Sequence, residues 1–135
     1  MGVKLLTGRA LECAFAGLAS ATPASADDAY SYCLDISSTS LEWGECGEAL
    51  LDRLEAALNT AWKGAQASVD QQTQKDLLAV QRAWLQFRDS SCRFWANGSY
   101  GRNGQVLYFI QCRAEITRTR ISDLNEISEF MREHD

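Results

Sequence analysis

"VQRAWLQFRDSSC", residues 80–92, decides the fold of this chain, because it places large apolar side chains and a cysteine at helical spacing. When the stretch is projected at 100° per residue, Trp84 and Cys92 fall on one face. Gln81 and Arg88 fall near the middle of the same arc and not at its rim. We therefore expect an amphipathic helix whose inner face includes an arginine.

The same helical period recurs on both sides of this stretch. Apolar residues at steps of three and four predict helices over residues 40–66, 70–96 and 105–132. The first helix starts with the spacing of a capping box, in which Thr39 and Glu42 each bond to the other's backbone N–H. Long helices joined by short links favour an antiparallel arrangement. We therefore predict an all-α fold, a disulfide-stapled antiparallel bundle of three main helices.

Residues 97–104, with the sequence NGSYGRNG, separate the last two predicted helices and hold three glycines. Glycine is unfavourable inside a helix and is typical of turns. This segment is therefore predicted to be a loop that projects from the end of the bundle and carries Tyr100 and Arg102.

The first 26 residues differ in composition from the rest of the chain. Lys4 and Arg9 precede a small, apolar run that ends in Ala24-Ser25-Ala26, which is typical of a signal peptide cleaved after Ala26. The alternatives are an ordinary amphipathic helix or a misassigned start codon. We expect residues 1–26 to be a signal peptide and residues 27–135 a single helical domain that is periplasmic or secreted. No later segment approaches the ~20 apolar residues of a membrane span, so we expect none.

The net charge limits the class of partner. The whole chain has a net charge of −5, and removing residues 1–26, with two cations and one carboxylate, leaves −6. Such a chain repels nucleic acid, whereas a basic protein or a cationic ligand has the complementary charge. On the outer face of the first predicted helix, four carboxylates form what we name the acidic ridge: Glu45, Glu48, Asp52 and Glu55.

Four cysteines follow residue 26: Cys33, Cys46, Cys92 and Cys112. An even number of cysteines in a small exported domain predicts two disulfides. Cys92 and Cys112 fall at similar heights on adjacent antiparallel helices, which favours a Cys92–Cys112 bond and leaves Cys33 for Cys46. A crossed pairing stays open at this point. Zinc sites usually contain closely spaced cysteines or histidines, and because the chain lacks both patterns we expect no metal and no cofactor.

Arginines near the centre of the predicted apolar faces need partners, because an unpaired buried guanidinium is not tolerated. We expect Arg88 and Arg120 to form structural ion pairs that fix the register of the helices, and the alternative is a ligand site. The carboxylates that could pair with them are Glu42, Glu55, Asp89 and Asp123. Three aromatic residues are likewise expected in the core, with a binding platform as the alternative: Trp84, Phe87 and Trp95.

The chain lacks the residues of most hydrolytic sites. A Ser or Cys nucleophile needs a base, and the only histidine is His134, near the end of the chain. Paired carboxylates could serve a glycosidase, but those of the acidic ridge lie on a predicted solvent face, where their pKa values should not separate. We therefore expect a binding protein and not an enzyme.

Taken in order, these residues resemble a known family, the small exported four-cysteine helical domain of LprI-type lysozyme inhibitors and of many bacterial envelope proteins. The resemblance spans about Cys33 to Leu124 and rests on an ordered set of short motifs. In chain order they are Glu42-x-x-x-Cys46, Leu58-Asn59-x-x-Trp62, Gln81-x-x-Trp84-x-x-x-Arg88-Asp89-x-x-Cys92 and Cys112-x-x-x-x-Thr117-x-x-Arg120-x-x-x-Leu124.

The chain departs from the usual pattern of this family at two positions. Glu55 stands where Asp is more frequent and Trp62 where Tyr is usual, and both keep the charge or the aromatic ring. Because a lipidation motif is missing, the chain is similar to the soluble members of the family.

The resemblance implies a basic protein partner such as lysozyme. The surfaces suited to it are the acidic ridge and the predicted loop with Tyr100 and Arg102. Two other functions stay open. One is a non-inhibitory module for interaction, immunity or stability that binds another envelope protein, and the other is an undetected carbohydrate-active enzyme.

Overall fold

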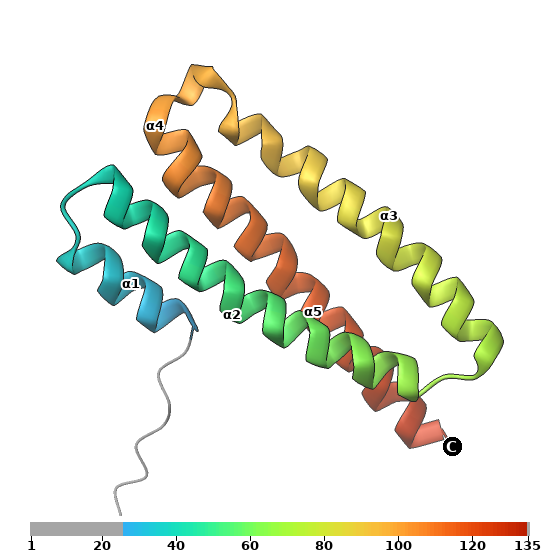
Figure 1. Cartoon of the computed structure of the whole chain (residues 1–135). Helices are drawn as coiled ribbons and strands as arrows, with labels where there is room; N and C mark the ends of the chain where they lie inside the picture. Colours follow the sequence, from blue (N-terminus) through green and yellow to red (C-terminus); the bar gives the residue numbers. More distant parts are fainter. Residues whose placement is uncertain (1–25, 135) are drawn as a thin grey trace, which may run out of the picture.

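The computed structural model describes residues 26–134, and within this range the chain is helical almost throughout and contains no strand. In chain order the helices are α1 (Ala26–Ile36), α2 (Ser40–Ala67), α3 (Gln71–Ala96), α4 (Gly101–Asn103) and α5 (Phe109–His134) (Figure 1). The all-α prediction is confirmed. The three long helices α2, α3 and α5 match the predicted ones, with α3 running antiparallel to α2 and α5.

The predicted signal peptide falls almost wholly on residues 1–25, which lie outside the described residues. None of the helices that the structure describes is long and apolar enough to cross a membrane.

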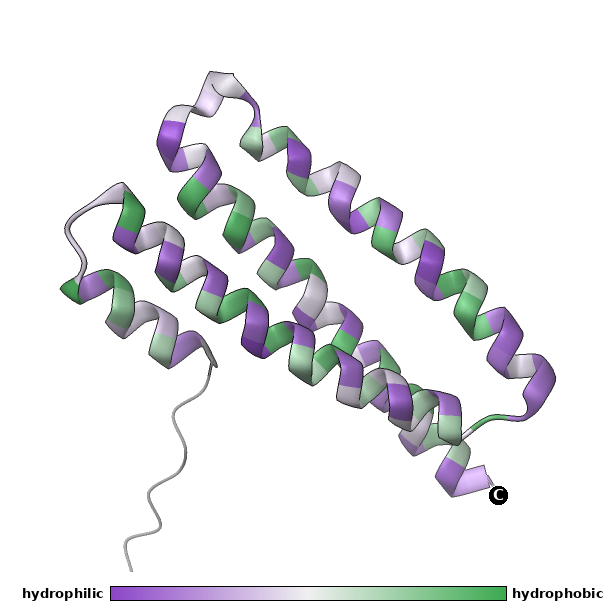
Figure 2. Ribbon diagram, in the orientation of Figure 1, coloured by the Kyte–Doolittle hydropathy of each residue, from purple (hydrophilic) through white to green (hydrophobic). Residues whose placement is uncertain are grey.

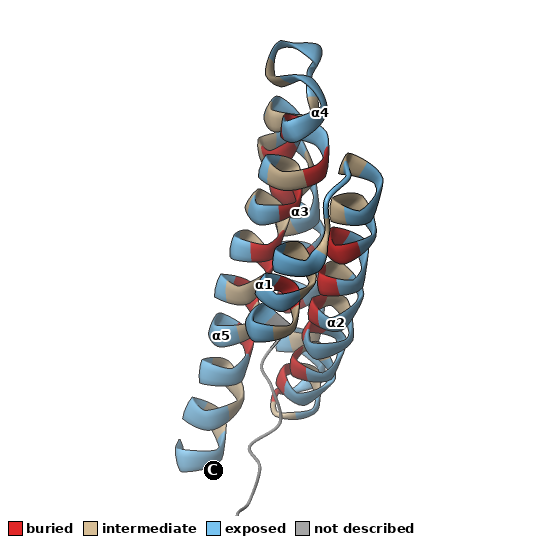
Figure 3. Cartoon of the chain, turned by 90° about the vertical axis from the view of Figure 1, so that its left-hand side faces the viewer, coloured by how far each residue is buried: buried red, intermediate tan, exposed pale blue. Residues whose placement is uncertain are grey.

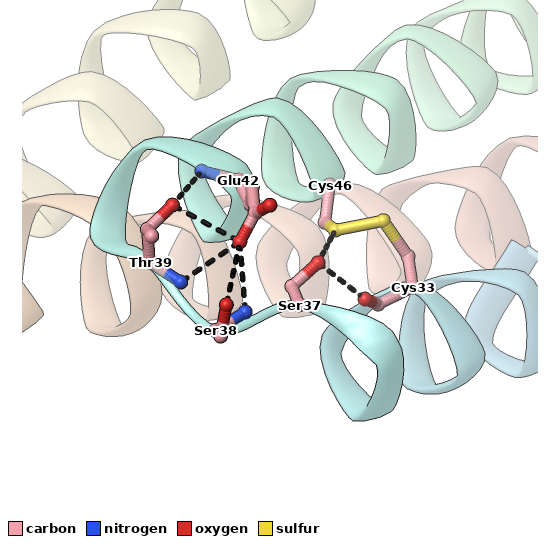
Figure 4. Close-up of a disulfide and its surroundings, with 6 residues drawn as sticks. All are labelled: Cys33, Ser37, Ser38, Thr39, Glu42 and Cys46. Carbon is pink, nitrogen blue, oxygen red and sulfur yellow. Dashed lines mark hydrogen bonds between the residues drawn. A yellow bond between two sulfur atoms is a disulfide. The ribbon is translucent and has the colours of Figure 1, made fainter.

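The helix α2 begins at the predicted capping box (Figure 4). Oγ1 of Thr39 accepts a hydrogen bond from the backbone N–H of Glu42 at 3.3 Å. In return, Oε2 of Glu42 accepts from the backbone N–H groups of Ser38 at 2.8 Å and of Thr39 at 2.9 Å. These N–H groups, followed by the Thr39 hydroxyl, hold the pKa of the Glu42 carboxyl below its usual value. Glu42 therefore serves the helix cap and does not form the ion pair that the sequence predicted for it.

The core consists of two clusters of buried side chains that follow one another along α2 and α5. Figure 3 shows buried positions recurring along the bundle. The first core cluster joins α1, α2 and α5 and contains Tyr30, Cys46, Leu50, Leu54, Ile110 and Ala114. The second core cluster joins α2, α3 and α5 and contains Leu58, Ala61, Ala65, Leu77 and Leu124. Each fully buried leucine contributes about 1.5–3 kcal/mol relative to an exposed one.

Glycine allows α2 and α5 to approach closely within the first core cluster. A Cβ atom on Gly47 would lie 2.8 Å from Cγ1 of Ile110, well inside van der Waals contact. The missing side chain therefore makes room for Ile110 on the opposite helix.

The structure also contains a helix, α1, that is not among the three helices predicted from the sequence. Tyr30 is buried against α2 and α5, and this burial raises the pKa of its hydroxyl. Arg118 of α5 forms an ion pair with Asp27. Packing, charge and the disulfide between Cys33 and Cys46 therefore combine to hold α1 on the bundle.

Part of the apolar arc of α3 stays exposed to solvent. Figure 2 shows hydrophobic segments recurring along this helix, and Val80, Phe87 and Phe94 are exposed at intervals of seven residues. The prediction that Phe87 lies in the core is therefore wrong. Trp84 and Trp95 are half-buried. The apolar arc of α3 is wider than the surface that the neighbouring helices cover.

Residues 97–104 form compact turns and not the predicted open loop. A 3₁₀ turn (Gly98–Tyr100), α4 and a π-helical turn (Gly104–Tyr108) lead into α5. Among residues 26–134, only Gly101 has a positive φ, of 60°. A Cβ atom on Gly104 would lie 2.5 Å from the backbone oxygen of Trp95. Glycine is thus needed at position 104 for close packing, and at position 101 for its backbone conformation.

Candidate functional site

Two disulfides hold one end of the bundle, which we name the tip end because it carries residues 97–108. Cys33 of α1 is bonded to Cys46 of α2, with 5.7 Å between their Cα atoms (Figure 4). Cys92 of α3 is bonded to Cys112 of α5, with 5.5 Å between their Cα atoms. The favoured pairing is confirmed, and the crossed pairing does not occur.

A buried arginine joins the three long helices below the tip end. Nη1 of Arg88, on α3, lies 2.5 Å from Oε1 of Glu55 on α2 and 3.3 Å from Oγ1 of Thr117 on α5. The guanidinium also lies over the ring of Trp84, 4.9 Å from its centroid. Next to it, Oδ1 of Asp89 lies 3.5 Å from Nε of Arg88. This network can set the register of the helices, because its partners come from all three of them.

The second inward arginine has a different kind of partner from the one expected. Arg120 is 7% exposed, and its Nε donates a hydrogen bond to the amide oxygen of Gln81 at 2.9 Å. The sequence predicted a carboxylate partner, but within residues 26–134 no carboxylate lies within 4 Å of the Arg120 guanidinium as an ion pair. Burial lowers the pKa of Arg120, while the charge of Asp123 acts in the opposite direction.

The predicted acidic ridge divides into two parts. Glu45, Glu48 and Asp52 are exposed on α2, whereas Glu55 is half-buried by its ion pair with Arg88. Glu55 therefore belongs to the Arg88 network, and a role for it in binding a partner stays a prediction. One helical turn along α2 is enough to separate these two environments.

A hollow of about 490 Å³ lies at the tip end, between the start of α2 and the π-helical turn. It brings Glu45 and Glu48 together with Arg102, although these residues are far apart in the sequence. We name it the tip hollow, and its lining residues are Leu41, Gly44, Glu45, Glu48, Leu51, Arg102, Gln105, Val106, Phe109 and Ile110. Charged side chains thus surround a floor that is mainly apolar.

Tyr100 lies outside the tip hollow and belongs to an aromatic cluster beside it. Its ring centroid is 5.0 Å from that of Trp95 and 5.3 Å from that of Phe94. Tyr108 joins the cluster through Trp95, at 5.8 Å. Together with Gln111 and Cys112, three of these aromatic residues line a second cavity of about 520 Å³. Of the six predicted partner-binding residues, only Glu45, Glu48 and Arg102 therefore share one hollow.

The residues of the tip hollow that sequence reasoning missed are mainly apolar ones. Gly44 and Gly47 could have indicated them, because glycines three residues apart are unfavourable inside a long helix and often mark a close approach. A Cβ atom on Gly44 would lie 3.7 Å from the side chain of Val106. The small residue thus keeps this side of α2 open next to the π-helical turn.

The arrangement at the tip end is suited to recognition of a protein surface. An apolar floor surrounded by charges of both signs is common at protein interfaces. Within residues 26–134, no three His, Cys, Asp or Glu side chains gather closely enough to hold a metal ion. His134 lies in the last turn of α5, at the other end of the bundle.

Comparison with known proteins gives one positive result. The sequence model of a protein family described as Lysozyme inhibitor LprI matches residues 33–124, more than half of the chain. No significant match is found among curated proteins or among solved structures. The matched residues begin in α1 and end in α5, so they include both disulfides and the whole tip end. This chain belongs to the LprI lysozyme inhibitor family.

Proposed function

We propose that this chain is an exported protein that binds lysozyme, or a related peptidoglycan-cleaving enzyme, through its tip end and inhibits it. The observation that carries the proposal is the tip hollow, in which Glu45 and Glu48 flank an apolar floor close to Arg102. Membership of a lysozyme inhibitor family supports the choice of target. The family and the two disulfides favour a location outside the cytoplasm, in the periplasm or the medium.

The charge of the chain supports a basic target. The net charge is −5, and Glu45, Glu48 and Asp52 are all exposed on one side of α2. Complementary charge accelerates association and orients the partners during encounter. The aromatic cluster beside the tip hollow adds the residue types that most often dominate binding energy at interfaces.

The rigidity of the tip end also supports a role in binding. The Cys92–Cys112 disulfide ties together the two helices that flank the turns, and Tyr100 packs closely on Gly104. A surface that is already ordered loses less conformational entropy when it binds. The tip end therefore has the preorganisation that a tight inhibitor requires.

The direct test is to mix purified residues 27–135 with lysozyme and to follow lysis of a cell-wall suspension at low and high salt. We expect lysis to slow as the protein is added, and the inhibition to weaken at high salt because exposed charges are screened. Unchanged lysis at a large molar excess would exclude inhibition of that enzyme.

A matched pair of variants tests the place of binding. Glu48→Gln removes one carboxylate from the tip hollow. Glu115→Gln removes one exposed carboxylate from the second turn of α5, outside the tip hollow, where its partner is Arg118. We expect the first to weaken lysozyme binding roughly fivefold or more, and the second to leave it within about twofold. If the two weaken binding equally, net charge alone matters and the tip hollow is not the site.

One observation favours a second candidate, a non-inhibitory module for interaction, immunity or stability that binds another envelope protein. The residues that carry the family motifs are mostly buried, as are Cys46, Gln81 and Arg88, whereas the charged residues of the tip hollow lie outside the motifs. Members of the family can thus share a fold and differ in their partners. Capture of a different envelope protein by the purified chain, with lysis unaffected, would support this candidate over inhibition.

A further inference from the structure

A second groove lies between α3 and α5, at the end of the bundle away from the tip end. Its volume is about 930 Å³, compared with about 490 Å³ for the tip hollow. Its floor is apolar, and Val80 and Phe130 in this floor are exposed to solvent. We name it the end groove, and the apolar side chains that line it are Val69, Leu77, Val80, Ile127, Phe130 and Met131.

The rim of the end groove carries a strong negative charge. Five exposed carboxylates line it: Asp76, Asp123, Glu126, Glu129 and Glu133. Arg120 is the one cationic side chain among the lining residues. An apolar floor with an acidic rim attracts a ligand that is apolar on one face and basic at its edges. The same rim repels nucleic acid and the phosphate groups of anionic lipids.

Arg120 contributes an unused hydrogen-bond donor to this groove. Its Nε is bonded to Gln81, but its Nη2 is buried and makes no hydrogen bond within the described residues. Buried donors are nearly always paired, because leaving one unpaired is unfavourable. Because Nη2 has almost no exposed surface, an acceptor oxygen on a bound ligand would reach it after a shift of the Arg120 side chain toward the groove.

We propose that the end groove binds the C-terminal turns of a basic amphipathic helix from a partner protein. The last carbonyl groups of a helix are free acceptors, and after such a shift of Arg120 one of them can accept from Nη2. Basic side chains are favoured in the last turns of helices and would face the five carboxylates. The apolar face of such a helix would cover Val80 and Phe130. This site is separate from the tip end, so the inference does not depend on lysozyme inhibition.

The probe for this site is a fluorescent amphipathic peptide of leucine and lysine, about 18 residues or five helical turns long. Binding to residues 27–135 is followed by fluorescence anisotropy. One control peptide has glutamate in place of lysine, and the other has the same composition in an order without an apolar face. We expect saturable binding of the first peptide only. Absence of binding, or equal binding of all three peptides, would overturn the proposal.

Two phenylalanines provide a matched pair of variants. Phe130 lines the end groove and is 58% exposed, whereas Phe87 lies outside it on α3 and is 59% exposed. We expect Phe130→Ala to weaken binding of the lysine peptide roughly tenfold and Phe87→Ala to change it less than about twofold. Both residues are largely exposed, so both variants should stay folded, which circular dichroism can verify. Equal effects of the two variants would contradict the end groove as the site.

Two further measurements separate the remaining explanations. Glu126→Gln with Glu129→Gln should reduce the salt dependence of peptide binding, and an unchanged salt dependence would contradict the role of the rim. Sedimentation velocity should show that residues 27–135 stay monomeric. A dimer that Phe130→Ala dissociates would make a second copy of the chain the occupant and would overturn the proposal.

Discussion

The two ends of the helical bundle are held together by different means. At the tip end, one disulfide joins α1 to α2 and another joins α3 to α5, next to the first core cluster. At the other end, the second core cluster holds α2, α3 and α5 by packing, and within residues 26–134 no disulfide reaches it. Covalent bonds are thus concentrated where the chain leaves regular helix for short turns. At the other end, apolar contacts and the Arg120–Gln81 hydrogen bond hold the helices together.

The largest effect should come from a cavity at the end of the bundle that no disulfide reaches within residues 26–134. Leu124 is fully buried in the second core cluster, so Leu124→Ala should lower the free energy of unfolding by about 2–5 kcal/mol. The matched variant is Leu50→Ala, at an equally buried position in the first core cluster. In Leu124→Ala, the rate of hydrogen exchange should rise mainly around residues 58–80. In Leu50→Ala, it should rise over a longer part of the chain. A uniform rise in both variants would show that the two ends open as one unit.

Removing the disulfide at the tip end should abolish the difference in hydrogen exchange between the two ends of the bundle. The double substitution Cys92→Ser with Cys112→Ser should lower the free energy of unfolding by roughly 2–4 kcal/mol, chiefly because the unfolded chain gains freedom. Chemical denaturation measures the loss, and hydrogen exchange should show the tip end exchanging as readily as the other end. In the control, Cys33→Ser with Cys46→Ser, the faster exchange should be confined to α1 and the start of α2. If the first double variant keeps its tip end protected, packing and not the bond makes that end rigid.

Substitutions at two glycines of α2 test how tightly each end of the bundle is packed. Gly47→Ala places a Cβ atom against Ile110 and should destabilise the protein by about 1–3 kcal/mol. Gly64 lies near the other end, where a Cβ atom would meet Oγ of Ser128 at an ordinary 3.5 Å. Gly64→Ala should therefore stabilise the protein by about 0.5–1 kcal/mol through its higher helix propensity. Urea midpoints that shift in the same direction for both variants would contradict this difference in packing.

The smallest effect should appear in the pH dependence of stability. The folded-state pKa of Glu42 is lowered, so its contribution to stability is present above the unfolded value of 4.5 and is lost as the pH falls through the folded pKa. Glu42→Gln should therefore differ most from the unsubstituted protein near neutral pH, and the difference should shrink in acid. Asp70 caps α3 at the other end, and its pKa is lowered mainly by the Thr73 hydroxyl, so Asp70→Asn should follow the same course. Thermal unfolding from pH 7 to pH 3 measures both variants, and a difference that grows in acid would contradict the assigned sign.

The long helices and the inward positions on them could be predicted because they depend on local periodicity. The spacing around residues 80–92 places Gln81 and Arg88 inside, and both are buried. The capping box could be predicted for the same reason, since its two residues are three positions apart. The partner of Arg120 could not, because an amide on another helix can replace a carboxylate only when that helix lies at the right height. The exposure of Phe87 depends on how much of α3 the neighbouring helices cover. A projection of α3 alone does not contain this information.

The candidate site could be predicted only in part. The period of α2 places Glu45 and Glu48 on one face, but Arg102 lines the same hollow only because residues 97–108 fold into successive turns. The three glycines of residues 97–104 correctly indicate an interruption between two helices. They do not show whether the segment forms an open loop or a set of packed turns. That distinction depends on Tyr100 and Trp95 closing around Gly104, which is a tertiary contact.

Each disulfide joins cysteines that follow one another along the chain, Cys33 with Cys46 and Cys92 with Cys112. In a chain that is exported N-terminus first and cleaved after Ala26, as we propose, Cys13 is removed and Cys33 meets its native partner before the later cysteines arrive. Cys92 then finds Cys46 already bonded and pairs with Cys112. Folding of such a chain in an oxidising compartment therefore needs an oxidase but no isomerase, and it avoids the slow reshuffling of wrongly paired cysteines. Cells that lack the isomerase should accumulate as much of the native protein as cells that possess it.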